Sequence, residues 1–127
     1  MGCDIHGWVE RKVGGKWIAV EKITGDARER NYRRFAALAG VRGDGPPARG
    51  LPENLSESTQ YAVDRDGSDG HSHSWLPLRE AAAIWGATRY TDAGDDGYAG
   101  RYPASHYFNI YDDENFDSYR VVFWFDN

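Results

Sequence analysis

The glycine pair Gly14-Gly15, set within a sequence of alternating residues, constrains the fold more than any other feature. Glycine accepts the positive φ angles of a tight two-residue turn, so residues 3 to 22 are predicted to form a β-hairpin. A two-residue turn pairs Val9 with Val20 and Val13 with Lys16. One face of the hairpin is then predicted to join the core, formed by Ile5, Val9, Val13, Ile18 and Val20. The other face carries Asp4, His6, Trp8, Trp17 and Ala19.

The last strand is predicted from residues 119 to 126, where nearly every position from Arg120 to Phe125 is apolar. Such a run is typical of a central strand that is covered on both faces. Residues 107 to 111 are predicted to form a further strand, joined to the last one by an acidic turn.

Two short helices are predicted. The spacing of Tyr32, Phe35, Ala36 and Ala39 is helical, Asn31 is a candidate N-cap, and Gly40 provides a left-handed stop. The second helix is expected to begin at Pro77 and end at Gly86. Its apolar stripe consists of Leu78, Ala81, Ile84 and Trp85.

The segments between these elements are rich in glycine and proline. Residues 41 to 74 are predicted to form a long irregular connection, with only residues 60 to 63 hinting at a short strand, and residues 87 to 105 form a second long loop. We therefore expect a single domain over residues 1–127 with an α+β fold. It would contain a small antiparallel sheet of four to five strands, two short helices and two long loops.

Composition narrows the class of protein. Hydrophobic residues make up 40% of the 127-residue chain, enough for a folded core. No apolar run approaches the roughly 20 residues that cross a bilayer, no signal peptide is visible, and one cysteine cannot form an internal disulfide. We expect a cytoplasmic protein without membrane contact. The formal net charge of −5 argues against binding of duplex nucleic acid through its phosphates.

Charge is uneven along the sequence. Arginines gather in the first half of the chain, at positions 28, 30, 33, 34, 42 and 49, while acidic residues crowd positions 92 to 96 and 112 to 117. The arginines could form a solvated helix face or contact an anion such as phosphate.

Three of the four histidines lie in two short polar motifs. The first is Cys3-Asp4-Ile5-His6, and the second runs from Asp69 to Trp75 with His71 and His73. Each histidine has an aspartate or serine nearby that could orient its ring or accept its proton. We therefore predict that the two motifs meet in one pocket.

Several motifs together make the chain resemble a group of small bacteriophage and prophage proteins. They are the opening Met1 to His6, Arg30-Asn31-Tyr32 with Phe35, Gly50-Leu51-Pro52, His71-Ser72, Ser74-Trp75-Leu76 and the closing Val122 to Asn127. Pro77 departs from the pattern, standing where a helix-capping threonine or serine is expected. The resemblance implies a phage origin and an accessory role against host defences, in the cytoplasm of the host cell.

Three functions fit these residues, and the sequence leaves all three open. In the first, the pocket binds a small phosphorylated or nucleotide-like ligand without a cofactor. The predicted ligand-binding residues are Asp4, His6, Trp8, Arg30, Asn31, Tyr32, His71, Ser72, His73 and Ser74.

In the second, the protein is a metal-dependent phosphodiesterase or nuclease that holds a divalent metal with Asp4, His6, Asp69, His71 and His73. In the third, it inhibits a host defence protein through an acidic surface around Asp92, Asp95, Asp96 and residues 112 to 117. Assembly into a homo-oligomer also stays open. Structural roles are the alternative for single residues, such as helix capping by Asn31 or Ser74.

Overall fold

The computed structural model describes residues 2–88, 107–108 and 117–127 of the chain. Within them, four strands form one antiparallel sheet in the order β2-β1-β4-β3, and three α-helices pack against it. The strands are β1 (Asp4–Val13), β2 (Lys16–Lys22), β3 (His71–Pro77) and β4 (Tyr119–Asp126). The helices are α1 (Tyr32–Ala39), α2 (Glu57–Asp66) and α3 (Leu78–Ala87), with 3-10 turns η1 (Gly25–Arg28) and η2 (Gly67–Asp69). The predicted α+β fold is confirmed.

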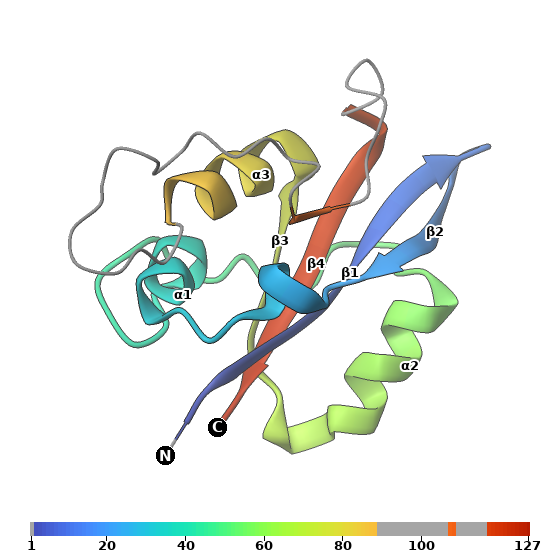
Figure 1. The fold of residues 1–127 in the computed structure, drawn as a ribbon. Coiled ribbons are helices and arrows are strands. Elements are labelled where there is room, and N and C mark those ends of the chain that lie inside the picture. Colours follow the sequence, from blue (N-terminus) through green and yellow to red (C-terminus); the bar gives the residue numbers. More distant parts are fainter. Residues whose placement is uncertain (1, 89–106, 109–116) are drawn as a thin grey trace.

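Helices cover both faces of the sheet, with α1 and α3 on one side and α2 on the other (Figure 1). Side chains along β4 point alternately to the two faces of the sheet and contribute to both cores. Phe123 and Phe125 belong to the core under α1 and α3, and Val122 and Trp124 belong to a smaller one under α2. All four side chains are buried. The predicted central position of the last strand is therefore confirmed.

The β1–β2 hairpin forms as predicted around Gly14 and Gly15, whose φ angles are 57° and 80°. The pairing of Val13 with Lys16 is also confirmed, but a bulge between Val9 and Glu10 places Val9 opposite Glu21 instead of Val20.

The prediction of the core face of this hairpin is only half right. Ile5 and Val9 are buried, whereas Val13, Ile18 and Val20 are 49%, 45% and 46% exposed. The reason is that the tip of the hairpin extends beyond the layer formed by α1 and α3 (Figure 1). Alternation along a regular strand fixes which residues share a face, but not how far the covering helices reach. For Val20 the bulge also breaks the alternation, because the register skips this residue.

The predicted helix caps are largely confirmed. The Asn31 side chain accepts a hydrogen bond from the Arg34 amide at 3.0 Å, and Gly40 ends α1 with a φ of 69°. The second predicted helix, α3, begins at Leu78 and ends at Ala87, so Pro77 is the last residue of β3 and not the first helical residue.

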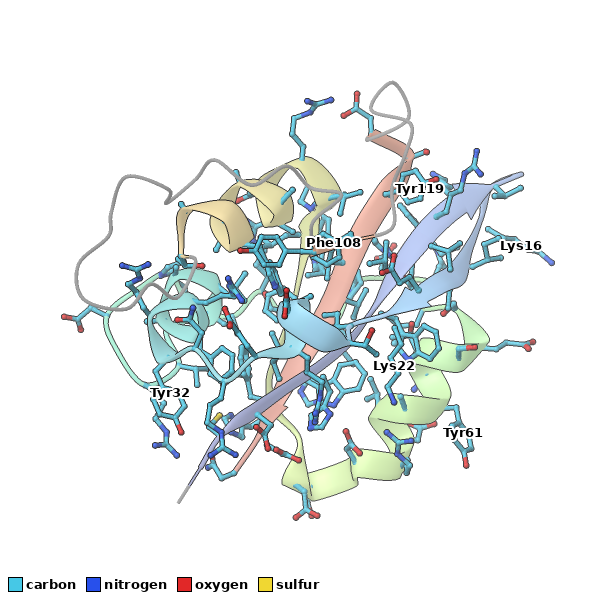
Figure 2. All side chains as sticks on the ribbon, in the orientation of Figure 1. Lys16, Lys22, Tyr32, Tyr61, Phe108 and Tyr119 are labelled. Carbon is cyan, nitrogen blue, oxygen red and sulfur yellow. The ribbon has the colours of Figure 1, made fainter. Side chains whose placement is uncertain are left out.

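The prediction of an irregular segment up to residue 74 is wrong in two places. Residues 60 to 63, expected to hint at a strand, lie inside α2, which begins after an N-cap in which the Ser56 side chain accepts from the Thr59 amide. The outer face of this helix is polar, and Tyr61 points away from the sheet with 69% exposure (Figure 2). Within the second histidine motif, residues 71–75 belong to strand β3, which runs directly into α3 at Leu78.

The predicted strand at residues 107 to 111 is not found where it can be assessed. Tyr107 and Phe108 are buried but do not belong to a strand, and residues 109–111 lie outside the described part of the chain. Nearly all of the second predicted loop and the acidic positions 92 to 96 also lie outside the described part of the chain.

Candidate functional site

Both histidine motifs flank the same end of β4. In the sheet register His6 of β1 lies opposite Trp124, and His71 of β3 lies opposite Phe125. The register therefore places both motifs at one end of the sheet, while their meeting in one pocket stays a prediction. Two β4 residues lie between them: Trp124 contacts the rings of His6 and His73, and Phe125 contacts the ring of His71.

A row of three aromatic rings crosses the sheet on the face covered by α2. The rings of His6 and Trp124 are stacked with centroids 6.4 Å apart, and those of His73 and Trp124 are stacked at 6.1 Å. The Trp124 indole Nε1 donates a hydrogen bond of 2.7 Å to Asp66 at the end of α2. This bond fixes the central ring of the row and joins α2 to the sheet.

A bulge in β3 sends the two histidines of the second motif to opposite faces. The β3–β4 register shifts between His71 and Ser74, and Ser72 has a φ of 55°. In a regular strand residues two apart share a face. Here the His71 ring lies beside Phe125 with centroids 6.3 Å apart, while His73 stacks on Trp124. The bulge therefore separates two residues that were predicted to act together.

The His73 ring is partly buried. Among the described residues its buried Nε2 atom has no hydrogen-bond partner. Burial lowers the pKa of His73, and the nearby His71 lowers it further, while Asp66 acts in the opposite direction. The ring is therefore held in its neutral form more strongly than an ordinary histidine, which favours a structural role in the row.

His6 forms a partly exposed polar pair with Asp126. Its Nε2 lies 3.0 Å from the Asp126 Oδ2 atom, with the two side chains 18% and 36% exposed. Because a carboxylate can only accept, the proton of a neutral His6 lies on Nε2, and Nδ1 is left as an acceptor. Such a pair can accept a hydrogen bond or a proton from a bound molecule.

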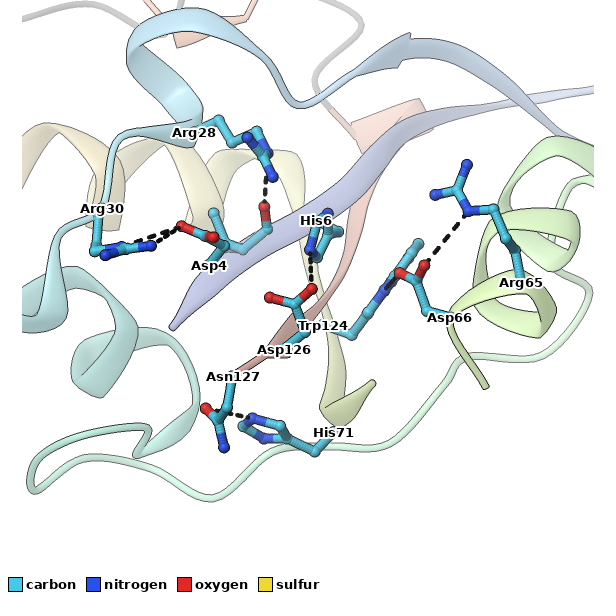
Figure 3. A network of polar contacts seen from close by, with 11 residues as sticks. Asp4, His6, Arg28, Arg30, Arg65, Asp66, His71, Trp124, Asp126 and Asn127 are labelled. Carbon is cyan, nitrogen blue, oxygen red and sulfur yellow. Dashed lines mark hydrogen bonds and ion pairs between the residues drawn. The ribbon is translucent and has the colours of Figure 1, made fainter. Parts of the chain in front are cut away.

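Two arginines lie beside this pair (Figure 3). Arg30 donates from Nε and Nη2 to Asp4 Oδ1, both at 3.1 Å, and Arg28 donates from Nε to the Ile5 carbonyl oxygen at 3.1 Å. Gly2 makes room for Arg30, because a Cβ atom at this position would lie 2.7 Å from Nη2. Both guanidinium groups are exposed but held in place by their bonds to β1.

Two neutral groups complete the region. His71 Nε2 lies 3.3 Å from the Asn127 Oδ1 atom, and its Nδ1 lies 3.0 Å from the Ser72 hydroxyl. We call the partly exposed groups at this end of the sheet the terminal cluster, which consists of Asp4, His6, Arg28, Arg30, His71, Asp126 and Asn127.

Some predicted ligand-binding residues have structural partners instead. Asn31 is buried, caps α1 and donates from Nδ2 to the Thr88 carbonyl at 2.6 Å. Ser74 is buried and accepts from the Arg49 amide at 3.0 Å, so it does not cap a helix. Trp8 packs in the apolar cluster under α2.

Tyr32 keeps an accessible ring near the terminal cluster. Its hydroxyl accepts from the Cys3 amide at 3.2 Å, and its ring is 37% exposed beneath the Arg42 guanidinium. Cys3 itself is fully buried, and burial raises the pKa of its thiol.

The predicted metal ligands are divided among several environments. Asp4 pairs with Arg30, His71 and His73 lie on opposite faces, and Asp69 is exposed on η2. Within the described ranges, no three histidine, cysteine, aspartate or glutamate side chains converge closely enough to hold a metal ion.

Sequence reasoning missed Asp126 and Asp66 as members of this region, and it named Arg28 only among the arginines that could contact an anion. Asp126 could have been predicted from the sequence, because alternation along the last strand places it on the same face as Trp124. Asp66 could not have been predicted in the same way, since the segment containing it was interpreted as irregular and not as a helix.

Comparisons with protein-family models, curated proteins and solved structures find no match to this chain. Among the described residues, no helix is both long and apolar enough to span a membrane. The function is therefore argued from the geometry of the terminal cluster.

Proposed function

We propose that the protein binds a small phosphorylated, nucleotide-like ligand at the terminal cluster. The observation that carries this proposal is the partly exposed His6–Asp126 pair lying at the same sheet end as the anchored guanidinium groups of Arg28 and Arg30. These groups come from β1, β4 and the segment around η1. A ligand at this place would contact parts of the chain that are far apart in sequence.

The two arginines are suited to phosphate. Guanidinium groups hold phosphate oxygens by forked hydrogen bonds, and a guanidinium already fixed by one bond loses less conformational freedom when it binds. Arg28 and Arg30 are each fixed through Nε. Their carboxylate neighbour Asp4 is neutralised by Arg30, which limits its repulsion of an anion.

The neutral groups of the cluster are suited to the rest of a nucleotide. His6 Nδ1 would accept a hydrogen bond from a ribose hydroxyl or a base amino group, and Asn127 can both donate and accept. The exposed ring of Tyr32 offers a surface on which a base can stack. Following the resemblance to phage proteins, we extend the proposal to a nucleotide signal of host defence as the ligand.

The test is to incubate the protein with cyclic dinucleotides and ADP-ribose-type nucleotides, and to chromatograph the free fraction before and after heat denaturation. Depletion of one nucleotide with intact recovery on heating is the expected result. Conversion to a new product would favour the phosphodiesterase alternative, and no depletion of any nucleotide would contradict the proposal.

A matched pair of variants locates the site. Arg30→Gln should weaken binding at least about tenfold, because it removes a charged phosphate contact. Arg49→Gln is the control, since Arg49 does not belong to the cluster and forms an exposed ion pair of 2.7 Å with Glu80 of α3. Equal binding by the two variants would place the ligand elsewhere.

A further inference from the structure

Residues 51–70, which contain α2, leave strand β3 and return to the same end of it. The Gly50 amide donates a hydrogen bond of 2.9 Å to the His73 carbonyl oxygen, and β3 itself begins at His71. The two ends of the segment are thus held by neighbouring residues of one strand. A segment anchored in this way can move as a unit, because its ends act as hinges while the chain on either side stays in place.

The rest of the described fold does not depend on this segment. None of the strand pairs in the described sheet includes a residue from 51–70. The described core under α1 and α3 contains none of these residues either. Helices α1 and α3 lie on the opposite side of the sheet from α2 (Figure 1). Movement of the segment would therefore leave the sheet and its larger core intact.

The apolar contact between α2 and the sheet is small. The buried residues of α2 are Thr59 and Ala62, and one of these is polar. Beneath the helix Trp124 is buried, whereas Trp8 and Trp75 are partly buried. Opening costs free energy in proportion to the apolar surface that it exposes to water. We therefore expect α2 to separate from the sheet at a lower cost than the larger core unfolds.

Hydrogen bonds at both ends of α2 define its closed position. At the start of the helix, the Ser56 amide donates to the Glu10 carboxylate at 2.8 Å. At its end, Asp66 accepts from the Trp124 indole at 2.7 Å. The helix has to break both bonds before it can leave the sheet. This arrangement favours movement of the whole helix over fraying from one end.

Gly70, the last residue of the segment, lies against two rings of the sheet. A Cβ atom at this position would lie 3.3 Å from Trp124 Cδ1 and 3.4 Å from His73 Nε2. In the closed form Trp124 is 1% exposed. Movement of the segment would bring both rings into contact with solvent.

We propose that residues 51–70 form a flap that opens from the sheet as one unit while the sheet, α1 and α3 stay folded. Opening exposes the face of the sheet that carries Trp8, Trp124 and His73. The closed form is the one in which the Ser56 and Asp66 bonds are made. The flap is independent of the ligand proposed for the terminal cluster.

The test is native-state hydrogen exchange of the full chain by NMR, at constant pH and in increasing urea below the unfolding transition. A ten-residue helix such as α2 is marginal on its own, so its amides exchange once the flap opens. We expect the opening constant measured by α2 amides to exceed that measured by β4 amides at least about tenfold. Its dependence on urea should also be shallower, because flap opening exposes less surface than global unfolding.

Two indole NH groups report on the two faces of the sheet in the same experiment. The Trp124 indole donates to Asp66 in the flap, whereas the Trp85 indole donates to the Ala27 carbonyl at 2.9 Å. Trp85 and Ala27 both belong to the core under α1 and α3. The Trp124 NH should therefore exchange with the α2 amides, and the Trp85 NH should exchange with the β4 amides.

Variants separate flap opening from global unfolding. Ile23, which is 1% exposed, belongs to the larger core, so Ile23→Val should speed exchange of β4 amides about two- to tenfold and leave α2 amides unchanged. Asp66→Ala should speed exchange of α2 amides at least about fivefold, because it removes a bond of the closed form. Asp64→Ala is the matched control, since Asp64 bonds to Gln60 within α2, and should change α2 exchange less than about twofold.

Three results would each overturn the proposal. The first is an equal urea dependence of exchange for α2 and β4 amides. The second is an equal response of both sets of amides to Ile23→Val. The third is exchange of the Trp124 indole NH at the opening constant of the Trp85 indole NH.

Discussion

Glu10 and Arg120 form an ion pair of 2.7 Å in which the side chains are 0% and 6% exposed. The second carboxylate oxygen of Glu10 accepts from the Ser56 amide at 2.8 Å, at the residue that caps α2. Arg120 also donates to the Asn54 carbonyl at 3.2 Å and packs on the Trp17 ring. One buried carboxylate thus joins β1, β4 and the start of α2.

We predict that Glu10→Ala lowers the free energy of unfolding by about 3–5 kcal/mol, because it leaves the buried charge of Arg120 without its partner. Urea denaturation at neutral pH measures the change. Glu57→Ala, in the exposed first turn of α2, should change stability by less than about 0.5 kcal/mol. A loss of under about 1 kcal/mol for Glu10→Ala would show that the pair does not anchor α2.

The bond between Asp66 and Trp124 gives a second prediction. Asp66→Ala should cost about 1–3 kcal/mol, because it removes the acceptor of a buried indole NH, while Asp66→Asn should cost less because an amide oxygen can still accept. Thermal or chemical denaturation compares the two. Asp64→Ala removes an exposed bond to Gln60 within the same helix and serves as the control.

The stability of the fold should depend on pH through His73. Burial and the nearby His71 lower the pKa of His73, although Asp66 opposes them, so the unfolded chain takes up a proton that the folded ring rejects. The free energy of unfolding should therefore fall as the pH drops below the ordinary histidine pKa of about 6.5. The slope that His73 contributes cannot exceed about 1.4 kcal/mol per pH unit.

The measurement is urea denaturation at pH 7.5 and 5.5. His73→Phe keeps a ring on Trp124 and should flatten the pH dependence, whereas His71→Asn should retain most of it, because burial is the main cause of the His73 shift. An unchanged slope in His73→Phe would assign the pH dependence to other groups.

The bulge at Ser72 provides a prediction about backbone strain. A φ of 55° is costly for branched side chains and free for glycine. Ser72→Val should destabilise the protein by about 1–2 kcal/mol, and Ser72→Gly should be tolerated. Denaturation curves of the two variants decide the matter, and equal stability would mean that the strand adjusts its register.

Sequence reasoning succeeded where a residue acts locally. The turn at Gly14, the Asn31 cap and the Gly40 stop depend on neighbours within a few positions, and the structure confirms each of them. Sequence reasoning failed for α2, because the buried residues of this helix are only Thr59 and Ala62. The helix therefore has no apolar stripe from which it could be predicted. The residue that caps this helix, Ser56, is bonded to Glu10, which is distant in sequence.

For the candidate site, the sequence identified His6, Asp4 and Arg30 but not their geometry. The bulge that separates His71 from His73 breaks the alternation from which strands are predicted, so β3 was interpreted as a loop. Asp126 becomes the partner of His6 only through the pairing of β1 with β4. Contacts across the sheet cannot be derived from spacing along one strand.

That pairing also determines the order in which the sheet can form. Strand β1 lies between β2, its neighbour in sequence, and β4, which pairs Asp4 with Asp126. The hairpin can fold early, but its inner edge stays open until residues 119–126 have left the ribosome. Contacts of such long sequence separation slow folding. We therefore expect the sheet to close later than the β1–β2 hairpin forms, once β4 is available to pair with β1.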